Sequence, residues 1–280
     1  MIDPADARQL DQLLRRHRIE LKHSLGQNFL TDPGLRDAIA EDADLGPDDE
    51  VLEVGAGVGT LTIALAPRAR RIVAVELDGR LIAALRESLA GVENVEVVRA
   101  DILRLNVRSA FPAGKEIVAG NIPYNLTGAL IRKLLDAPPR PRRLSLVVQK
   151  EVAERWTAST GASLSTVAVQ VFAEAHLRLA IPRAAFTPPP RVDSALVRLD
   201  VRERPAVDVD DLNGFFRFVE AVFQGRRKQL GGTLGRISGT GSTAAGARLR
   251  ETGIDPERRP QTLKVGEWEA LYKEFRSPEG

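Results

Sequence analysis

Residues 50–59, EVLEVGAGVG, decide the fold of this chain. Their first half, Glu50–Val54, predicts a buried β-strand, and the three glycines that follow lead into a helix starting near Thr60. Glycines in such a turn let the backbone bend tightly and approach a ligand at the N-terminus of a helix. The spacing is G-x-G-x-G and not the dinucleotide fingerprint G-x-G-x-x-G, so the turn alone is a weak indication of a nucleotide site.

Apolar runs predict three further strands, which end at Glu76, just before Asp101 and at Asn121. The carboxyl ends of parallel strands meet at one edge of a sheet, so we expect the glycine turn and these side chains to face one crevice. Glu76 has the separation from the glycine turn at which an acid meets a ribose diol, and Asp101 suits a hydrogen bond to an adenine amine. The pattern predicts an adenosine-containing cofactor, although each acid taken singly could be a helix cap.

The tetrapeptide Asn121-Ile122-Pro123-Tyr124 follows the last of these strands. The amide oxygen of Asn121 can accept a hydrogen bond from an exocyclic amine, and Pro123 favours an extended Ile122 whose carbonyl can accept a second. Tyr124 adds a flat face on which a base can stack, typically worth about 1–3 kcal/mol. The alternative is an ordinary turn, because Asn, Pro and Tyr are common after strands.

Composition excludes several classes of function. The 280-residue chain holds 40 lysines and arginines, 38 aspartates and glutamates, three histidines and no cysteine. Disulfides and thiolate catalysis are excluded, and we expect no metal site because the histidines are scattered. The N-terminus lacks the features of a signal peptide and no apolar run is long enough for a bilayer, so we expect a cytoplasmic protein without membrane contact.

The chain length favours a large domain followed by a small one. We expect an α/β domain with an N-terminal helical extension over residues 1–204, and a helical domain over residues 205–280. In the first domain, Asp32 is expected to cap a helix that Pro33 begins, and Thr127 is expected to cap another. In the second, helices are predicted at 212–223, 226–234, 244–251 and 266–275, with a flexible glycine- and serine-rich segment at 238–242.

Residues 212–250 carry seven basic side chains against one acid, Glu220. Such an excess of basic over acidic side chains favours a polyanionic partner, although a solvated helix face is the simpler alternative.

Seven motifs are spread over the two predicted domains: GQNFL at 26–30, the glycine turn, NIPY at 121–124, QKEV at 149–152, FTPPPRVDS at 186–194, RRK at 226–228 and GIDP at 253–256. Together they resemble the ribosomal RNA adenine N6-dimethyltransferases over about residues 21–271, and within that family the bacterial enzymes of small-subunit (16S) rRNA. The resemblance implies a Rossmann-like methyltransferase domain that uses S-adenosylmethionine, with a small all-helical C-terminal domain. It also implies dimethylation of two adjacent adenines in a hairpin loop near the 3′ end of that RNA, within an immature ribosomal particle. We expect the enzyme to act as a monomer.

The resemblance also implies site residues. As contacts of the cofactor it implies Asn28, Leu30, Gly55, Gly57, Glu76 (ribose), Asp101 (adenine) and Asn121 (near the methionine part). As the catalytic set it implies Asn121, Ile122, Pro123, Tyr124 and Phe186, with the two aromatic rings sandwiching the target base. As RNA contacts it implies Arg226, Arg227 and Lys228. The adenine N6 would attack the sulfonium methyl directly, with no dedicated general base.

The chain departs from the family pattern at Ala56, where proline is frequent, at Ile122 and Gly225, where leucine and glutamine are usual, and at Ala162-Ser163, where Tyr-Gly is usual. These departures concern RNA binding more than the transfer of the methyl group.

Four alternatives remain at the level of the sequence. The nearest is the related group that methylates one adenine of large-subunit (23S) rRNA and confers macrolide resistance. A DNA adenine methyltransferase would share the tetrapeptide but lack the C-terminal motifs. A mainly non-catalytic ribosome assembly factor could keep the fold without the reaction. A nicotinamide dehydrogenase is the weakest alternative, since the glycine spacing differs and the tetrapeptide would be idle.

Overall fold

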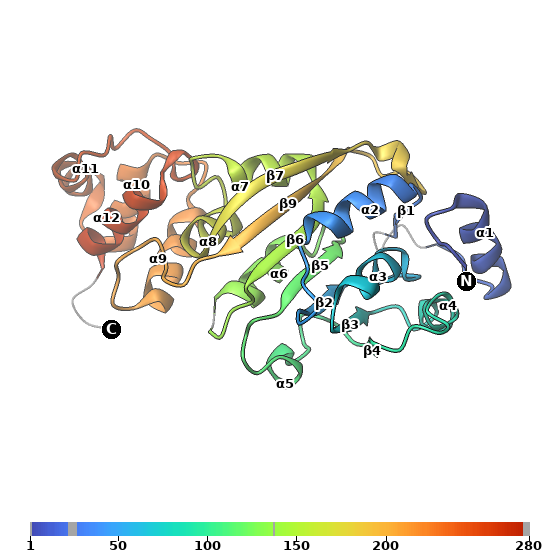
Figure 1. Cartoon of the computed structure of the whole chain (residues 1–280). Helices are drawn as coiled ribbons and strands as arrows, with labels where there is room; N and C mark the ends of the chain where they lie inside the picture. The colour runs from blue at the N-terminus through green and yellow to red at the C-terminus, as the bar shows by residue number, and fades with distance from the viewer. Residues whose placement is uncertain (1, 22–26, 137, 277–280) are drawn as a thin grey trace. The chain divides into compact units, whose positions relative to one another are not determined.

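The computed structural model of the chain describes residues 2–21, 27–136 and 138–276. The chain divides into two compact units whose elements are labelled in Figure 1. The first comprises Met1–Glu154 with Glu174–Val201, and the second comprises Arg155–Ala173 with Arg202–Gly280. Residues 155–173 group with the C-terminal helices because their apolar side chains pack there: the ring of Phe172 stacks on that of Phe216, with 5.5 Å between centroids.

Within the described residues, seven strands form the main sheet of the first unit, in the order β4-β3-β2-β5-β6-β9-β7. Their bounds are β2 Glu50–Val54, β3 Arg71–Glu76, β4 Val95–Arg99, β5 Ile117–Asn121, β6 Arg143–Gln149, β7 Ala173–Ile181 and β9 Ser194–Val201. Strands β2 to β6 pair in parallel, and β9 pairs antiparallel with β6. The predicted parallel α/β sheet is confirmed, and its strand order reverses direction between β2 and β5.

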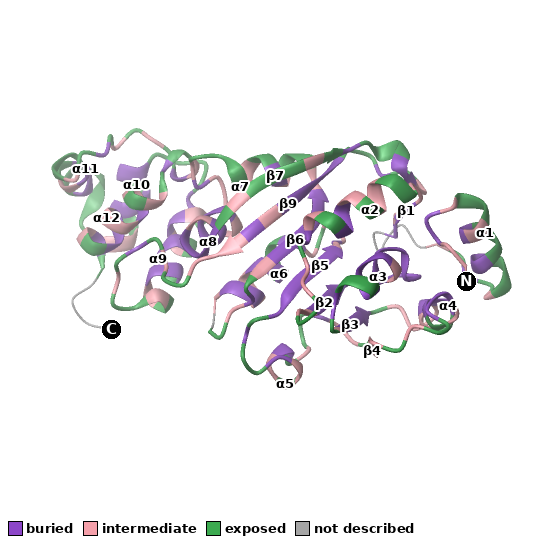
Figure 2. Cartoon of the chain, viewed as in Figure 1, coloured by how far each residue is buried: buried purple, intermediate pink, exposed green. Residues whose placement is uncertain are grey.

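The central strands are apolar because both of their faces are covered. Four of the five residues of β2 and of β5 are buried, and so are five of the seven residues of β6 (Figure 2). Ile39 and Leu65, from two helices, belong to the same buried cluster as Val51 of β2 and Ala119 of β5. The core that fixes the sheet therefore also fixes the ends of its strands.

The helices of the first unit are α1 Ala7–Arg16, α2 Pro33–Asp42, α3 Thr60–Leu65, α4 Leu81–Ser88, α5 Val107–Ala110 and α6 Thr127–Leu135, while α7 Lys150–Thr157 crosses into the second. Asp32 caps α2 as predicted, with its carboxylate accepting a hydrogen bond from the Leu35 amide at 3.0 Å. The prediction for Thr127 was wrong, since Leu126 is the capping residue and Thr127 is the first helical residue.

A second, two-stranded sheet joins distant parts of the sequence. Strands β1 Phe29–Leu30 and β8 Phe186–Thr187 pair antiparallel, with Leu30 opposite Phe186. This pairing connects two of the motifs on which the resemblance rests, and no periodicity in the sequence predicts it because each strand has two residues.

The second unit contains α8 Leu164–Phe172, α9 Leu212–Gln224, α10 Leu230–Ser238, α11 Gly241–Glu251 and α12 Val265–Phe275. Aromatic rings of α9 and α12 form its core; Phe215 meets Tyr272 edge to face at 5.6 Å. One prediction was wrong here. Residues 226–228 lie in the turn between α9 and α10, not in a helix. In the segment 238–242, only Gly239 and Thr240 lie between α10 and α11, and Gly239 adopts a left-handed conformation (φ 69°) that ends α10.

Candidate active site

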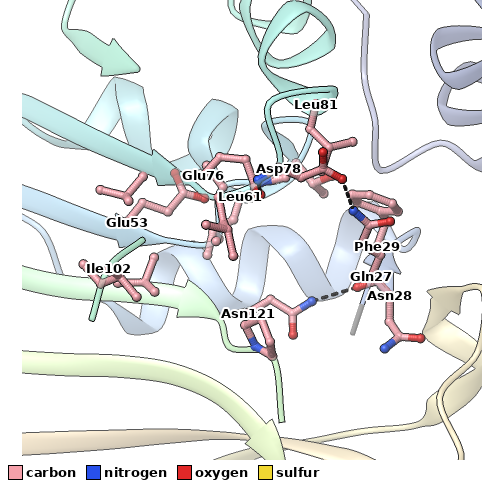
Figure 3. Close-up of a pocket in the computed structure, with 18 of the residues that line it drawn as sticks. Gln27, Asn28, Phe29, Glu53, Leu61, Glu76, Asp78, Leu81, Ile102 and Asn121 are labelled. Carbon is pink, nitrogen blue, oxygen red and sulfur yellow. Dashed lines mark hydrogen bonds between the residues drawn. The ribbon is translucent and has the colours of Figure 1, made fainter. Parts of the chain in front are cut away.

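A pocket opens at the carboxyl ends of β2, β3 and β5, where the strand order reverses (Figure 3). Such a crevice is the usual ligand site of an open α/β sheet. The predicted residues that line it are Asn28, Leu30, Gly55, Gly57, Glu76, Asp101, Asn121, Pro123 and Phe186. The tertiary structure thus brings together every residue expected to contact the cofactor, from four strand ends and the β1 loop.

Two members of the expected catalytic set are not among the lining residues. Ile122 is 1% exposed, and its backbone amide donates to the carbonyl oxygen of Val147 at 3.0 Å. Tyr124 is half-buried, and its hydroxyl lies 2.8 Å from Oγ of Ser194. Phe186 lines the pocket but is 3% exposed and belongs to the hydrophobic core, so its ring forms part of the wall.

The glycine turn has the left-handed backbone that the sequence predicts. Gly55, Gly57 and Gly59 have φ values of 74°, 60° and 90°, which side chains other than hydrogen rarely allow. A Cβ on Gly57 would lie 3.0 Å from the ring of Phe29. The Ala56 amide donates to the carbonyl oxygen of Val75 at 3.1 Å, a hydrogen bond that the proline frequent in the family could not make.

Glu76 is held rigidly at the end of β3. Its Oε2 accepts a hydrogen bond from the Gly57 amide at 2.8 Å, and its Oε1 accepts one from the Asp78 amide at 2.7 Å. Burial raises the pKa of this carboxyl, while the two amides favour its charged form. Each carboxylate oxygen keeps a second acceptor position, so Glu76 can receive both hydroxyls of a ribose diol.

Asp78 is a pocket residue that the sequence interpretation missed. Its carboxylate accepts hydrogen bonds from the Arg80 guanidinium and, at 2.8 Å, from the amide nitrogen of Gln27. The hydrogen bonds from Arg80 are the main reason that its pKa falls to about 2. Gln27 and Asp78 tie the β1 loop to the β3 end of the pocket (Figure 3), and the spacing Glu-x-Asp after a strand was the available signal. Gly26 of the same motif lies outside the described residues.

The side-chain amide of Asn121 is oriented by a backbone carbonyl. Its Nδ2 donates a hydrogen bond to the Asn28 carbonyl oxygen at 2.9 Å (Figure 3). A carbonyl can only accept, so the nitrogen must face Asn28 and the amide oxygen is turned away from it. Asn121 therefore presents an acceptor, as the hypothesis of amine recognition requires.

Glu53 is the second pocket residue that the sequence interpretation missed, and its signal was an acid inside an apolar strand. It is 1% exposed, and its Oε2 has no hydrogen-bond partner among the described residues. Burial raises its pKa to about 8. Asp101, by contrast, is partly exposed and accepts a hydrogen bond from the Leu103 amide at 2.9 Å, so it caps a turn and not a helix, which was the alternative interpretation of the sequence.

The charge of the pocket indicates the charge of its ligand. Its acids are Glu53, Glu76, Asp78 and Asp101, and the lining includes no Lys, Arg or His among the residues described. An anionic pyrophosphate would be repelled by this lining, whereas a cationic cofactor with a ribose diol would be attracted. The lining thus fits S-adenosylmethionine and counts against a nicotinamide dinucleotide.

Arg226, Arg227 and Lys228 are exposed in the turn between α9 and α10, and within the described chain none of them forms an ion pair. Gly225 before them packs tightly: a Cβ there would lie 2.6 Å from Cγ2 of Thr233, which is 1% exposed. The glutamine usual in the family would therefore require the side chain of Thr233 to shift. Ser163, another departure, caps α8 by accepting a hydrogen bond from the Thr166 amide at 3.2 Å.

Within the described ranges, no group of three or more histidine and acidic side chains is arranged to hold a metal ion. No helix in those ranges combines the length and apolar character needed to cross a bilayer.

The strand order, the glycine turn and the acidic pocket define a Rossmann-like methyltransferase fold. The solved structure of a 23S rRNA methyltransferase, ErmE, is similar (TM-score 0.69, 33% identity, 89% of this chain and 100% of that one). So is a dimethyladenosine transferase from Plasmodium falciparum (TM-score 0.71, 26% identity, 88% and 97%). Residues 18–277 match the Ribosomal RNA adenine dimethylase family, and the chain belongs to that family.

Among curated proteins, the chain is 41% identical to a Ribosomal RNA small subunit methyltransferase A of Pelotomaculum thermopropionicum, over 98% of each sequence. It is 37% identical to the protein of the same name from Geobacillus kaustophilus, over 96% of each. The predicted family is confirmed.

Proposed function

We propose that this protein transfers methyl groups from S-adenosylmethionine to N6 of two adjacent adenines in the 3′-terminal hairpin loop of small-subunit rRNA, giving N6,N6-dimethyladenosines. The observation that carries the proposal is the match, over nearly the whole chain, to relatives named for the small-subunit reaction. The substrate is an immature small subunit, and the protein works in the cytoplasm, where such particles are assembled.

The cofactor is held by acceptors at the strand ends. When bound, S-adenosylmethionine supplies a methyl group on a positively charged sulfur. Glu76 receives the ribose hydroxyls and Asp101 the adenine amine, while Asn28, Leu30, Gly55 and Gly57 shape the wall around them. The acidic lining supports this assignment, because it lowers the free energy of a bound cation.

Asn121 orients the target base. Its amide oxygen and the carbonyl of Ile122 accept the two N6 hydrogens, and Tyr124 stacks against the ring. The N6 lone pair is conjugated with the ring, so fixing both hydrogens favours a pyramidal nitrogen aimed at the methyl carbon. Bound S-adenosylmethionine would supply the methyl group to N6, its sulfur would leave with the electron pair of the broken sulfur–carbon bond, and N6 would then lose a proton to solvent.

Arg226, Arg227 and Lys228 contribute contacts to RNA phosphates. Their exposure and their lack of ion pairs among the described residues support this role, because an acid nearby would compete with the phosphates. The target adenine lies in a loop, so unstacking it costs less than in a duplex.

The test is transfer of labelled methyl groups to unmethylated small subunits and, in parallel, to unmethylated large-subunit RNA, with the modified bases mapped. Label at two adjacent adenines of the small-subunit hairpin is the expected result. Label confined to large-subunit RNA would instead assign the protein to the 23S type, which the similarity to ErmE keeps as the second candidate. Tight small-subunit binding without label would indicate a non-catalytic assembly factor.

A further inference from the structure

Of two motifs of the sequence, QKEV at 149–152 and FTPPPRVDS at 186–194, only Phe186 lines the pocket. The structure brings them together behind the tetrapeptide. Gln149, the last residue of β6, pairs with Ser194, the first residue of β9. The next amide along, that of Lys150, donates to the carbonyl oxygen of Asp193 at 3.0 Å. The end of one motif is thus fixed against the end of the other by main-chain hydrogen bonds.

Asp193 also holds the segment from the other side. Its Oδ1 accepts a hydrogen bond from the Arg183 amide at 2.9 Å, at the start of the short helix Arg183–Ala185 that precedes β8. Ser194 is consequently placed by contacts on both of its sides, and it is fully buried. A buried hydroxyl in so constrained a position keeps one location relative to the sheet.

The hydroxyl of Ser194 meets the hydroxyl of Tyr124, with 2.8 Å between the two oxygens. The backbone end of Tyr124 is fixed as well, because the Leu126 amide donates to the carbonyl oxygen of Pro123 at 2.8 Å and closes the turn around it. Both ends of the tyrosine side chain are therefore anchored. A ring held at its Cα and at its phenol oxygen keeps the direction of its long axis, which sets how a base can stack on it.

We propose that Ser194 is a positioning residue that fixes the Tyr124 ring for stacking against the target adenine, and that the two motifs serve to hold Ser194 in place. The inference rests on the proposed function, since it assigns Ser194 to the same base-binding site. Ser194 does not touch the substrate; it acts through Tyr124.

The test compares single-turnover methyl transfer by the wild type, Ser194→Ala, Tyr124→Phe and the double variant, all as full-length protein. Each single variant should be slower by about three- to tenfold, the range expected for one hydrogen bond. The double variant should be no slower than either single one, because both changes remove the same contact. Ser194→Thr, which keeps a hydroxyl, should recover part of the rate.

Further readouts separate positioning from a general loss of structure. Affinity for S-adenosylmethionine should change less than twofold in the Ser194→Ala variant. The fluorescence of an RNA with 2-aminopurine at the target position should be quenched less by this variant than by the wild type, because the base stacks less well on Tyr124. Ser145→Ala is the matched control: Ser145 is 1% exposed on β6, and its hydroxyl has no hydrogen-bond partner among the described residues. This control should transfer methyl groups at the wild-type rate.

A wild-type rate in Ser194→Ala, or additive losses in the double variant, would overturn the inference while leaving the proposed function intact. Equal loss in Ser145→Ala would also overturn it, since packing alone would then explain the effect. No transfer by the wild type to any rRNA would overturn the proposed function itself, and this inference with it.

Discussion

The amide nitrogen of Asn121 lies 2.9 Å from the carbonyl oxygen of Asn28, across 93 positions of sequence. This hydrogen bond joins the loop before β1, which lines the pocket, to the first residue of the tetrapeptide that we propose receives the target base. It also fixes which end of the Asn121 amide faces away from Asn28, so the loop before β1 orients the acceptor.

Replacing Asn121 with Ala should lower the single-turnover rate of methyl transfer by at least about 100-fold, because it removes an acceptor that orients the reacting amine. RNA affinity should fall by no more than a few-fold, since Asn121 contacts no phosphate. Asn121→Asp keeps an acceptor but loses the donor to Asn28, so its rate should lie between the rates of the wild type and of Asn121→Ala. Parallel rate and filter-binding measurements check this, and equal losses in both would contradict the assignment.

Glu76→Ala should weaken binding of S-adenosylmethionine by about 10- to 100-fold, because it removes a charged acceptor and leaves the Gly57 amide without its partner. Titration calorimetry measures the affinity directly, without RNA. Glu93→Ala, an exposed acid at the opposite ends of the strands, is the matched control and should bind as the wild type does. Unchanged affinity in Glu76→Ala would exclude Glu76 from the cofactor site.

Glu53 should make the stability of the protein depend on pH. Its pKa is about 8 in the folded chain, against an ordinary value of 4.5 for a glutamate, so between these values the folded state retains a proton that the unfolded state has lost. The free energy of unfolding therefore falls as pH rises through this window, by up to about 1.4 kcal/mol per pH unit.

Denaturant unfolding of the wild type and Glu53→Gln at several pH values between about 5 and 8 measures this contribution. The variant should be the more stable of the two at the alkaline end, with the difference shrinking toward the acidic end. Glu76, whose pKa is also raised, interacts with Glu53 through its charge, so the comparison measures the contribution of Glu53 together with this interaction. Parallel pH profiles would show that Glu53 is charged in the folded state.

Gly225 and Gly232 should respond in opposite ways to the same substitution. A Cβ on Gly225 would lie 2.6 Å from buried Thr233, so Gly225→Ala should destabilise the protein by about 1–3 kcal/mol. Gly232 is an exposed residue of α10 with nothing within 4 Å of a Cβ, so Gly232→Ala should stabilise by up to about 1 kcal/mol. Thermal unfolding checks both, and adding Thr233→Ala should restore part of the loss. A neutral Gly225→Ala would refute the steric explanation.

Neutralising Arg226, Arg227 and Lys228 together, each to Gln, should weaken RNA binding and flatten its salt dependence. The slope of log affinity against log salt concentration should fall by about 2, if each cation meets one phosphate. Arg70→Gln is the control, because Arg70 pairs with Glu50 at 3.2 Å at the opposite ends of the strands. An unchanged slope in the triple variant would mean that the three cations face solvent and do not contact RNA phosphates.

Much of the site could be predicted because its residues occupy positions that local rules define. Glu76 and Asn121 end strands whose apolar residues are buried, and Asp101 follows the partly exposed strand β4. Parallel strands bring their carboxyl ends to one edge. Glu53 was not predicted because it is a single acid inside an otherwise apolar strand. Its raised pKa depends on complete burial by residues distant in the sequence. The turn at 226–228 was not predicted because helix-forming residues lie on both sides of it. Only the packing of Gly225 on Thr233 shows where α9 ends.

The sequence by itself determined the parallel sheet, the glycine turn and the identity of the groups at the strand ends, since these follow from periodicity and backbone freedom of neighbouring residues. Only the tertiary structure decided which groups meet. The pairing of Leu30 with Phe186 and the contacts of Asn121 with Asn28 and of Tyr124 with Ser194 join segments far apart in the chain. No local pattern encodes such contacts, because they depend on the register of the whole sheet and on the packing that holds it.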